Sequence, residues 1–543
     1  MAVHRRRKSP AAAFRIALIV AANVAAVWFL WTLVHPPARA AVPDSERSSS
    51  ALASVPRAAT LPRLTATPAE SRSTARLAAL GARIRGIVER AKRQAAKSTR
   101  GRVDVGSMHV AVHLRDPRTG AEFGLDANRA LRPASNMKIV TTAAALTLLG
   151  SDWCFATPIE ARGTMVEGRL DGDLVLRASG DPLFDPEADG AIARLLAPAL
   201  DELARSGLMR VSGRLVLDEG TFDAPAPPPG WPGADQRYFE YCALSGGFSA
   251  NRGCVTVRVA PTTVGAPARI EVEPAGFGLE KQFSATTSAS GKVAVGFDAR
   301  PTGLIVRGTI PKTQEPYVGS CPVPDPVLLF AGALRHELAA RGIRVEGATV
   351  RERDAAPGRV LATIRTPLAQ YLVPINQESN NAVADQLWLA TANAFMKNGA
   401  RAGAEAASLA ALERLHVSGD GFRQVDGSGL SDRNRVSARQ LTALLQASLD
   451  AETASLYRSS FAVAGVSGTL EKRMRNSPAK GRIIAKTGFI DGSSALSGIA
   501  RTSGGDEILF SILVNYEEFG GLNTSAWKPM GDEICELLVG AEL

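Results

Sequence analysis

The spacing of hydrophobic positions predicts three elements in the first part of the chain after residue 75. Residues 76–98 carry apolar side chains three and four positions apart, which predicts an amphipathic helix. Residues 109–115 alternate apolar and polar positions, and the Asp-Pro and Gly turn after them predicts a hairpin with residues 121–125. A sustained apolar stretch then predicts a helix from Ser135 to Leu149, followed by a glycine stop.

The pattern changes between residues 161 and 324, where short β-branched runs are separated by Gly, Pro and Asn. This composition predicts one or two small β-rich domains. Helical spacing returns at Asp325, which with the following proline favours a helix start, and again after Ser379. The chain closes with three strand candidates and a helix, at residues 482–490, 494–502, 507–516 and 526–540. A β-rich domain inserted into an α/β host is the simplest organisation.

The first 75 residues have a different character. His4-Arg-Arg-Arg-Lys8 is a cationic cluster, an uncharged apolar run fills residues 16–34, and Ala38-Arg-Ala40 fits a small-residue cleavage site. This order predicts a signal peptide or a membrane anchor over residues 1–40. Either one places the folded part outside the cytoplasm, in the periplasm or at the outer face of the inner membrane. Residues 41–75 are rich in Ala, Pro, Ser and Arg and predict a linker.

Charge and cysteine content narrow the class of protein. The net charge is +10, but residues 1–40 hold six cations and no acid, so the rest of the chain carries only +4. That argues against nucleic-acid binding, which needs a basic folded face. The five cysteines have no zinc-site spacing, and no metal or cofactor is expected. Cys242 and Cys254 are the closest pair and are a candidate disulfide. His109 and His113 alternate on a predicted strand and are interpreted as a solvated face.

Three short motifs carry the candidate chemistry. They match S-x-x-K, S-x-N and K-T-G, the signature set of serine β-lactamases and penicillin-binding proteins, and they are Ser135-Asn-Met-Lys138, Ser379-Asn-Asn381 and Lys486-Thr-Gly488. The first pattern recurs at Ser477-Pro-Ala-Lys480. Only Ser135 begins a sustained helix, and the K-T-G motif follows a strand-like run. The ordered set therefore predicts Ser135 as a nucleophile.

A base must take the proton of a serine hydroxyl before that hydroxyl attacks. Lys138 is one helical turn from Ser135 and shares its face. Burial and a nearby cation, which we expect to be Lys486, would lower the pKa of Lys138 and let it act as this base. The Ser379 hydroxyl can relay a proton to a leaving amine. The alternative role for Ser379 is a helix N-cap, and both roles are compatible only if the hydroxyl is free during the reaction.

The remaining motif residues suit substrate binding. Asn381 carries an amide that fits a substrate peptide bond, although it could also be a capping residue. Lys486 and Thr487 offer a cation and a hydroxyl for a terminal carboxylate. Gly488 lets a substrate backbone lie close against the strand. The next backbone N–H, at Phe489, would form an oxyanion hole with the N–H of the nucleophile.

On these residues the chain resembles the D-alanyl-D-alanine carboxypeptidase/endopeptidase family, the low-molecular-mass class C penicillin-binding proteins, over residues 76–543. The stretches that carry the resemblance are Pro133-Ala-Ser-Asn-Met-Lys138, Ser179-Gly-Asp-Pro182, Glu378-Ser-Asn-Asn381, Asp426-Gly-Ser-Gly-Leu-Ser431 and Ala485-Lys-Thr-Gly488. The 244-residue interval from Ser135 to Ser379 also fits, because this family fills it with extra domains.

The resemblance implies a penicillin-binding/β-lactamase-like transpeptidase fold of the α/β (α+β) class, with an antiparallel sheet flanked by helices. The catalytic domain would comprise residues 76–160 and 325–543, and one or two β-rich domains would be inserted at 161–324. It also implies hydrolysis of the D-Ala–D-Ala bond of peptidoglycan stem peptides, in many relatives cleavage of cross-links, and acylation by β-lactams. The implied roles are nucleophile, base, relay, substrate contact and carboxylate partner for Ser135, Lys138, Ser379, Asn381 and Lys486.

One departure keeps two alternatives open. Many relatives have Thr or Ser after K-T-G, where this chain has Phe489. The backbone N–H is retained, but a hydroxyl that could bind the substrate carboxylate is lost. A serine β-lactamase shares the motifs, although the long insert argues against its compact architecture. A wall-binding or sensor protein that acylates without turnover is the other alternative, and Phe489 is its only support.

Overall fold

The computed structural model describes residues 67–542. The predicted signal peptide or anchor at residues 1–40 therefore lies outside the described residues, as does most of the predicted linker. The first helix, α2 (Pro68–Ser98), begins earlier than expected, because Thr67 caps it by accepting a hydrogen bond from the backbone N–H of Glu70 (3.1 Å). Within residues 67–542, no helix has both the length and the apolar character needed to cross a bilayer.

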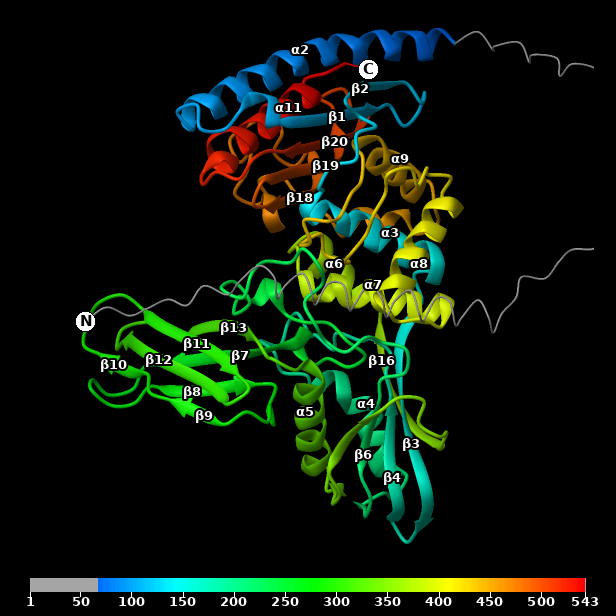
Figure 1. Ribbon diagram of the computed structural model, residues 1–543, viewed down its shortest axis with the longest axis vertical. Coiled ribbons are helices and arrows are strands. Elements are labelled where there is room, and N and C mark those ends of the chain that lie inside the picture. Colours follow the sequence, from blue (N-terminus) through cyan, green and yellow to red (C-terminus); the bar gives the residue numbers. More distant parts are fainter. Residues whose placement is uncertain (1–66, 543) are drawn as a thin grey trace, which may run out of the picture. The chain divides into compact units, whose positions relative to one another are not determined.

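A six-stranded antiparallel sheet forms the centre of the catalytic region (Figure 1). Its order is β17-β18-β19-β20-β1-β2, so strands from the C-terminal part of the chain lie beside the N-terminal hairpin. The bounds in that order are Ala462–Val463, Ile483–Ile490, Ser493–Arg501, Glu507–Asn515, His109–Arg115 and Glu122–Leu125. The hairpin and the three terminal strands predicted from the sequence are confirmed.

Helices cover both faces of this sheet. On one face, α2 and the terminal helix α11 (Lys528–Val539) enclose a core that includes Leu77, Phe510 and Ile534 (Figure 1). On the other face, the sheet packs on α3 and α9, and these in turn contact the remaining helices. Their bounds are Met137–Leu149 (α3), Ala369–Asn376 (α6), Asn381–Met396 (α7), Arg401–Arg414 (α8), Ala438–Leu449 (α9) and Ala454–Ser459 (α10). The predicted α/β fold, an antiparallel sheet flanked by helices, is confirmed.

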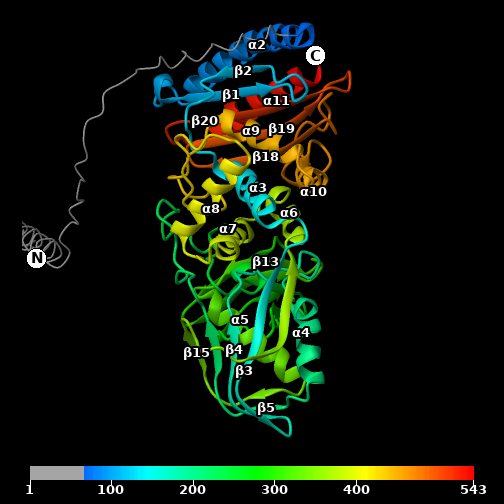
Figure 2. The same ribbon diagram turned by 90° about the vertical axis from the view of Figure 1, so that its right-hand side faces the viewer.

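The inserted region contains three further sheets. The largest has seven strands and includes the long neighbours β3 and β16 (Figure 2). Its strands are Cys154–Val166 (β3), Arg169–Arg177 (β4), Arg210–Val211 (β5), Leu215–Asp218 (β6), Arg344–Val345 (β14), Thr349–Glu352 (β15) and Arg359–Pro367 (β16). The helices α4 and α5 pack against it, with bounds Ala193–Arg205 and Pro326–Ala340.

The two smaller sheets of this region have the orders β13-β7-β8 and β10-β12-β11, and β9 pairs with β12. Their strands are Cys254–Ala260 (β7), Arg269–Glu273 (β8), Lys281–Phe283 (β9), Thr286–Ser288 (β10), Ala294–Arg300 (β11), Gly303–Pro311 (β12) and Tyr317–Pro322 (β13). The β-branched runs of the sequence fall in these strands and in the larger sheet.

The inserted region is larger than the sequence pattern indicates. Asp325 caps α5 as expected, accepting from the backbone N–H of Val327 (2.9 Å). However, α5 belongs to the inserted core, where Leu334 is buried in one apolar cluster with Ile159 and Ile364. The predicted boundaries at residues 160 and 325 therefore fall inside the inserted region, which extends from β3 to β16.

Two other expectations are wrong. All five cysteines are free, so Cys242 and Cys254 form no disulfide. His113 does not lie on a solvated face: its side chain is fully buried, and its Nδ1 is 2.5 Å from Thr442 Oγ1. The reason is that β1 lies between β20 and β2, with helices over both faces of the sheet.

Candidate active site

Ser135 lies in a 3-10 turn, η2 (Ala134–Asn136), that leads directly into α3. The K-T-G strand β18 passes close to this turn. A Cβ added at Gly488 would be 3.1 Å from the backbone nitrogen of Ser135 and 2.9 Å from the carbonyl oxygen of Pro133. The glycine is therefore required for the strand and the nucleophile turn to approach this closely.

Lys138 is fully buried and its Nζ has three hydrogen-bond partners. It lies 3.0 Å from Ser135 Oγ, 2.7 Å from Asn381 Oδ1 and 2.7 Å from the carbonyl oxygen of Ser428. The last two atoms can only accept. A neutral amine would satisfy them with its two N–H groups and leave its lone pair directed at the Ser135 hydroxyl. The geometry thus suits proton removal from Ser135.

The electrostatics of the two buried lysines favour a neutral amine. Burial lowers the pKa of Lys138 to about 7, although the charges of Asp426 and Asp385 act in the opposite direction. Burial, and not the neighbouring cation expected from the sequence, lowers the pKa of Lys138. Lys486 is also fully buried, and its Nζ donates to the carbonyl oxygen of Thr487 (3.1 Å). Burial and then the charge of Lys138 hold the pKa of Lys486 well below its usual value.

The Ser379 hydroxyl is not used as a helix cap. The N-cap of α7 is Asn380, whose side chain accepts from the backbone N–H of Val383 (3.0 Å). Ser379 has a left-handed backbone, with φ 68°, and lines the same cleft as Ser135. Of the two roles considered from the sequence, the N-cap is therefore excluded, and the hydroxyl is free to exchange protons.

The cleft beside the nucleophile has a volume of about 360 Å³. One wall is the outer edge of β18, where β17 pairs only with Ile484 and Ala485. From Lys486 onward this edge has no strand partner among residues 67–542, so an extended peptide can add to it. Thr487 Oγ1 donates to Thr469 Oγ1 (2.8 Å) on the short helix η5 (Gly468–Leu470). Thr469 is a cleft residue that no sequence motif indicated.

The Asn381 amide is occupied at both ends. Its oxygen accepts from Lys138, and its nitrogen donates to the carbonyl oxygen of Tyr241 (3.0 Å). Tyr241 comes from the inserted region and helps line a hollow of about 610 Å³ that also includes Trp231 and Phe489. The structure therefore places Asn381 between the base and this hollow. Its predicted contact with a substrate amide would replace or share the bond to Tyr241.

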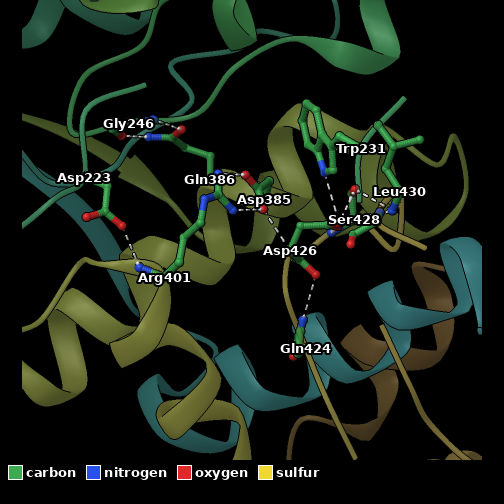
Figure 3. A network of polar contacts seen from close by, with 12 residues as sticks. Asp223, Trp231, Gly246, Asp385, Gln386, Arg401, Gln424, Asp426, Ser428 and Leu430 are labelled. Atoms are coloured by element: carbon green, nitrogen blue, oxygen red, sulfur yellow. Dashed lines mark hydrogen bonds and ion pairs between the residues drawn. The ribbon is translucent and has the colours of Figure 1, made fainter. Parts of the chain in front are cut away.

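Asp426 organises the loop that holds the base, a role that the sequence did not reveal. Its buried carboxylate accepts from four consecutive backbone N–H groups, those of residues 428–431, and from Trp231 Nε1 (3.0 Å) (Figure 3). These bonds fix the carbonyl of Ser428, which accepts from Lys138. The Gly- and Ser-rich run after Asp426 was the available signal, and in the sequence it supported only the family resemblance.

A buried ion pair supports the same loop from the other side. Asp385 of α7 bonds both terminal nitrogens of Arg401 on α8, at 3.1 and 2.8 Å (Figure 3). It also accepts from the backbone N–H of Gly427 (2.8 Å). The loop 426–431 is thus held by Asp385 at residue 427 and by Asp426 at residues 428–431. Because this loop positions the Ser428 carbonyl that accepts from Lys138, the two carboxylates also help to position Lys138 relative to Ser135.

A serine at the start of a helix, a buried lysine one turn away, a free second serine and a K-T-G edge strand together define a serine acyl-transfer site of the penicillin-binding class. The sequence pattern of the D-Ala-D-Ala carboxypeptidase 3 (S13) family matches residues 104–530. The chain belongs to this family, whose members are serine-type peptidases.

Individual relatives agree with this assignment. The chain is 33% identical over 422 residues to the D-alanyl-D-alanine carboxypeptidase of Actinomadura sp. (strain R39), covering 74% of this chain and 76% of that protein. It is 28% identical over 404 residues to the D-alanyl-D-alanine carboxypeptidase DacB of Haemophilus influenzae, covering 72% and 82%. The crystal structure of penicillin binding protein 4 (dacB) from Haemophilus influenzae shares the fold, with a TM-score of 0.66 and 23% identity over 82% of this chain and 98% of that one.

Proposed function

We propose that this carboxypeptidase removes the terminal D-Ala from peptidoglycan stem peptides through an acyl-enzyme at Ser135, and that it also cuts D-alanyl cross-links. The observation that carries the proposal is the geometry of Lys138. Its amine is buried, lies 3.0 Å from Ser135 Oγ, and has a pKa lowered to about 7 by that burial. A surface lysine would be protonated at neutral pH and could not take the serine proton.

Acylation follows from this geometry. Neutral Lys138 takes the Ser135 proton while Oγ attacks the carbonyl carbon of the penultimate D-Ala. The backbone N–H groups of Ser135 and Phe489 stabilise the resulting oxyanion. The C–N bond then breaks as the free hydroxyl of Ser379 delivers its proton to the leaving amine. The proton that Lys138 took from Ser135 passes through Lys486 to Ser379 and restores that hydroxyl. D-Ala departs and the ester remains on Ser135.

Deacylation uses the same groups in the opposite sense. Lys138 or Ser379 takes a proton from a water molecule, the hydroxide attacks the ester carbonyl, and Ser135 Oγ recovers its proton. β-Lactams would acylate the same oxygen and block this second step.

The shape of the site supports an extended and branched substrate. A peptide can pair with the free edge of β18, where the cleft residue Thr487 can bind a terminal carboxylate. Phe489 borders both the 360 Å³ cleft and the 610 Å³ hollow, so the site continues beyond the scissile bond. The neighbouring hollow supports the endopeptidase activity, because a cross-linked substrate carries a second peptide.

We place the enzyme outside the cytoplasm, where peptidoglycan lies. The support is the cationic, apolar and small-residue order of residues 1–40. Fractionation of cells that express the full chain tests this placement, and recovery in the cytoplasmic fraction would contradict it. Retention in the membrane fraction would indicate that residues 16–34 act as an anchor.

The test of function combines two substrates. The purified enzyme should release D-Ala from a stem pentapeptide and convert a cross-linked muropeptide dimer into monomers, and Ser135→Ala should do neither. Intact-mass analysis after benzylpenicillin should show one adduct, which peptide mapping places on Ser135. An enzyme that forms the adduct but releases no D-Ala would be the acylating sensor, and rapid hydrolysis of nitrocefin with no D-Ala release would indicate a β-lactamase.

A further inference from the structure

This chain has Phe489 after K-T-G, where many members of the family have a hydroxyl that can bind the substrate carboxylate. If the enzyme selects substrates with a C-terminal carboxylate, another group must bind that carboxylate. The strand register shows where to look. Thr487 pairs with Leu496 and Phe489 pairs with Ser494, and paired residues share a face of the sheet. Leu496 lies in the apolar core beneath α11, so Thr487 and Phe489 project on the α11 side.

Two cations line the cleft on that side, Arg473 and Lys528. Arg473 is already paired, because its Nε and a terminal nitrogen both bond Asp532 Oδ1, at 3.0 and 2.6 Å. The side chain of Lys528 is exposed and has no hydrogen bond or ion pair with any described residue. Its ammonium is therefore the uncompensated charge of the cleft.

The cleft beside Ser135 differs from the neighbouring hollows in the charge of its lining. None of the described residues that line the 360 Å³ cleft is acidic. The acids Asp491 and Glu518 line two neighbouring hollows that Phe489, which is 51% exposed, also borders, and Lys528 borders the smaller of these hollows as well. An anion that enters beside Ser135 therefore meets the positive charge of Lys528 and no acidic side chain within the cleft itself.

We propose that Lys528 binds the C-terminal carboxylate of the scissile peptide, together with Thr487, in place of the hydroxyl that is absent at position 489. This inference rests on the proposed function, because it concerns the substrate of the same site. Lys528 acts in binding and selection and takes no part in proton transfer. Its ammonium forms a charge-assisted contact with a group that is present in the substrate and in the leaving D-Ala.

The experiment compares substrates with and without the carboxylate. The variant is Lys528→Gln, Lys528→Arg is the conservative replacement, and Lys472→Gln removes an exposed charge next to Arg473 that does not line the cleft. The first pair of substrates is a diacetyl-Lys-D-Ala-D-Ala peptide and its C-terminal amide. Lys528→Gln should lower kcat/KM for the acid by about 5- to 20-fold, mainly through KM, the range of a charged contact at a partly exposed site.

The amide should react equally with wild type and with Lys528→Gln, Lys528→Arg should recover most of the loss, and Lys472→Gln should change neither substrate. An equal loss on acid and amide, or no loss on either, would overturn the assignment of Lys528.

A second pair of ligands separates this inference from the proposed function. Acylation of Ser135 is measured with benzylpenicillin and with its methyl ester, which lacks the carboxylate. Lys528→Gln should slow acylation by the acid and leave the ester unchanged, whether or not the wild type releases D-Ala. Absence of D-Ala release would therefore refute the peptidase proposal alone, and equal acylation rates with the acid in wild type and variant would refute the role of Lys528 alone.

Discussion

The low pKa of Lys138 makes a quantitative prediction about the pH dependence of acylation. At about pH 7.5 a lysine with the ordinary pKa of 10.5 is neutral in roughly one molecule in a thousand, whereas a pKa of about 7 makes roughly three quarters of the molecules neutral. Burial therefore raises the population of the reactive base by about 700-fold. Acylation should rise with pH through about 7 and fall roughly ten-fold per unit below that value.

The assay is the second-order rate constant for acylation by a fluorescent penicillin, measured from about pH 5 to about pH 9. Lys138→Arg keeps a cation of similar length but has a pKa above 12, so acylation should fall by about 10²- to 10⁴-fold at every pH. Lys472→Arg, an exposed replacement of the same kind, should behave as wild type. A wild-type rate that does not change between about pH 5 and pH 8 would refute Lys138 as the base. Because that profile uses the unmodified enzyme, the result stands even if Lys138→Arg folds poorly.

Four further outcomes are expected. Ser135→Ala should abolish penicillin labelling without loss of the urea unfolding transition, and labelling of another serine would overturn the nucleophile. Phe489→Thr should raise the efficiency of D-Ala release if the ring limits carboxylate binding, and an unchanged kcat/KM would show that the carboxylate is held elsewhere. Asp426→Asn removes a charge that raises the pKa of Lys138, so the acylation profile should move to lower pH, and a profile that does not move would contradict the coupling. Burial and the charges of Arg439 and Arg115 lower the pKa of His113 to about 3 in the folded protein. Between about pH 6.5 and pH 3 the unfolded chain therefore binds a proton that the folded protein does not, and the free energy of unfolding should fall with pH, by roughly 2 kcal/mol at about pH 5. His113→Gln should remove this pH dependence of stability in urea titrations.

The sequence predicted those features that depend on local patterns. Alternation and apolar runs located the three terminal strands, and the Asp325-Pro326 pair located the start of α5, because strand alternation and helix capping involve neighbours in the chain. Ser135 and Lys138 were also predictable from a local pattern, because residues three positions apart on a helix lie on the same face. The order of the motifs then indicated that Lys486 and Ser379 belong to the same site.

Features that depend on which helices and strands pack against one another were not predictable from the sequence. The periodicity of α5 indicates a helix but not that it packs in the inserted core with Ile159 and Ile364. His113 alternates like a solvated residue and is buried because β1 has a strand on each side. Cys242 and Cys254 are close in sequence, but closeness along the chain does not create the geometry of a disulfide.

Contacts of individual residues in the active site were likewise not predictable from the local sequence. In the sequence, Ser379 and Asn381 were considered as caps, whereas the structure uses Asn380 between them, and this leaves the Ser379 hydroxyl available. The bonds from Asp426 to residues 428–431 form only when the loop closes around the carboxylate.

The strand order of the central sheet also determines when during synthesis the enzyme can become active. The nucleophile follows β2, near the start of the folded chain, but the strand that completes its oxyanion hole, β18, is made about 350 residues later. The inserted sheets can form while β1 and β2 still lack their partner β20. A nascent or truncated chain therefore carries Ser135 and Lys138 without an assembled site, and hydrolysis of the cell wall must await the last three strands, β18, β19 and β20. The topology acts as a safeguard: peptidase activity appears only in a chain that has been made and folded almost to its end.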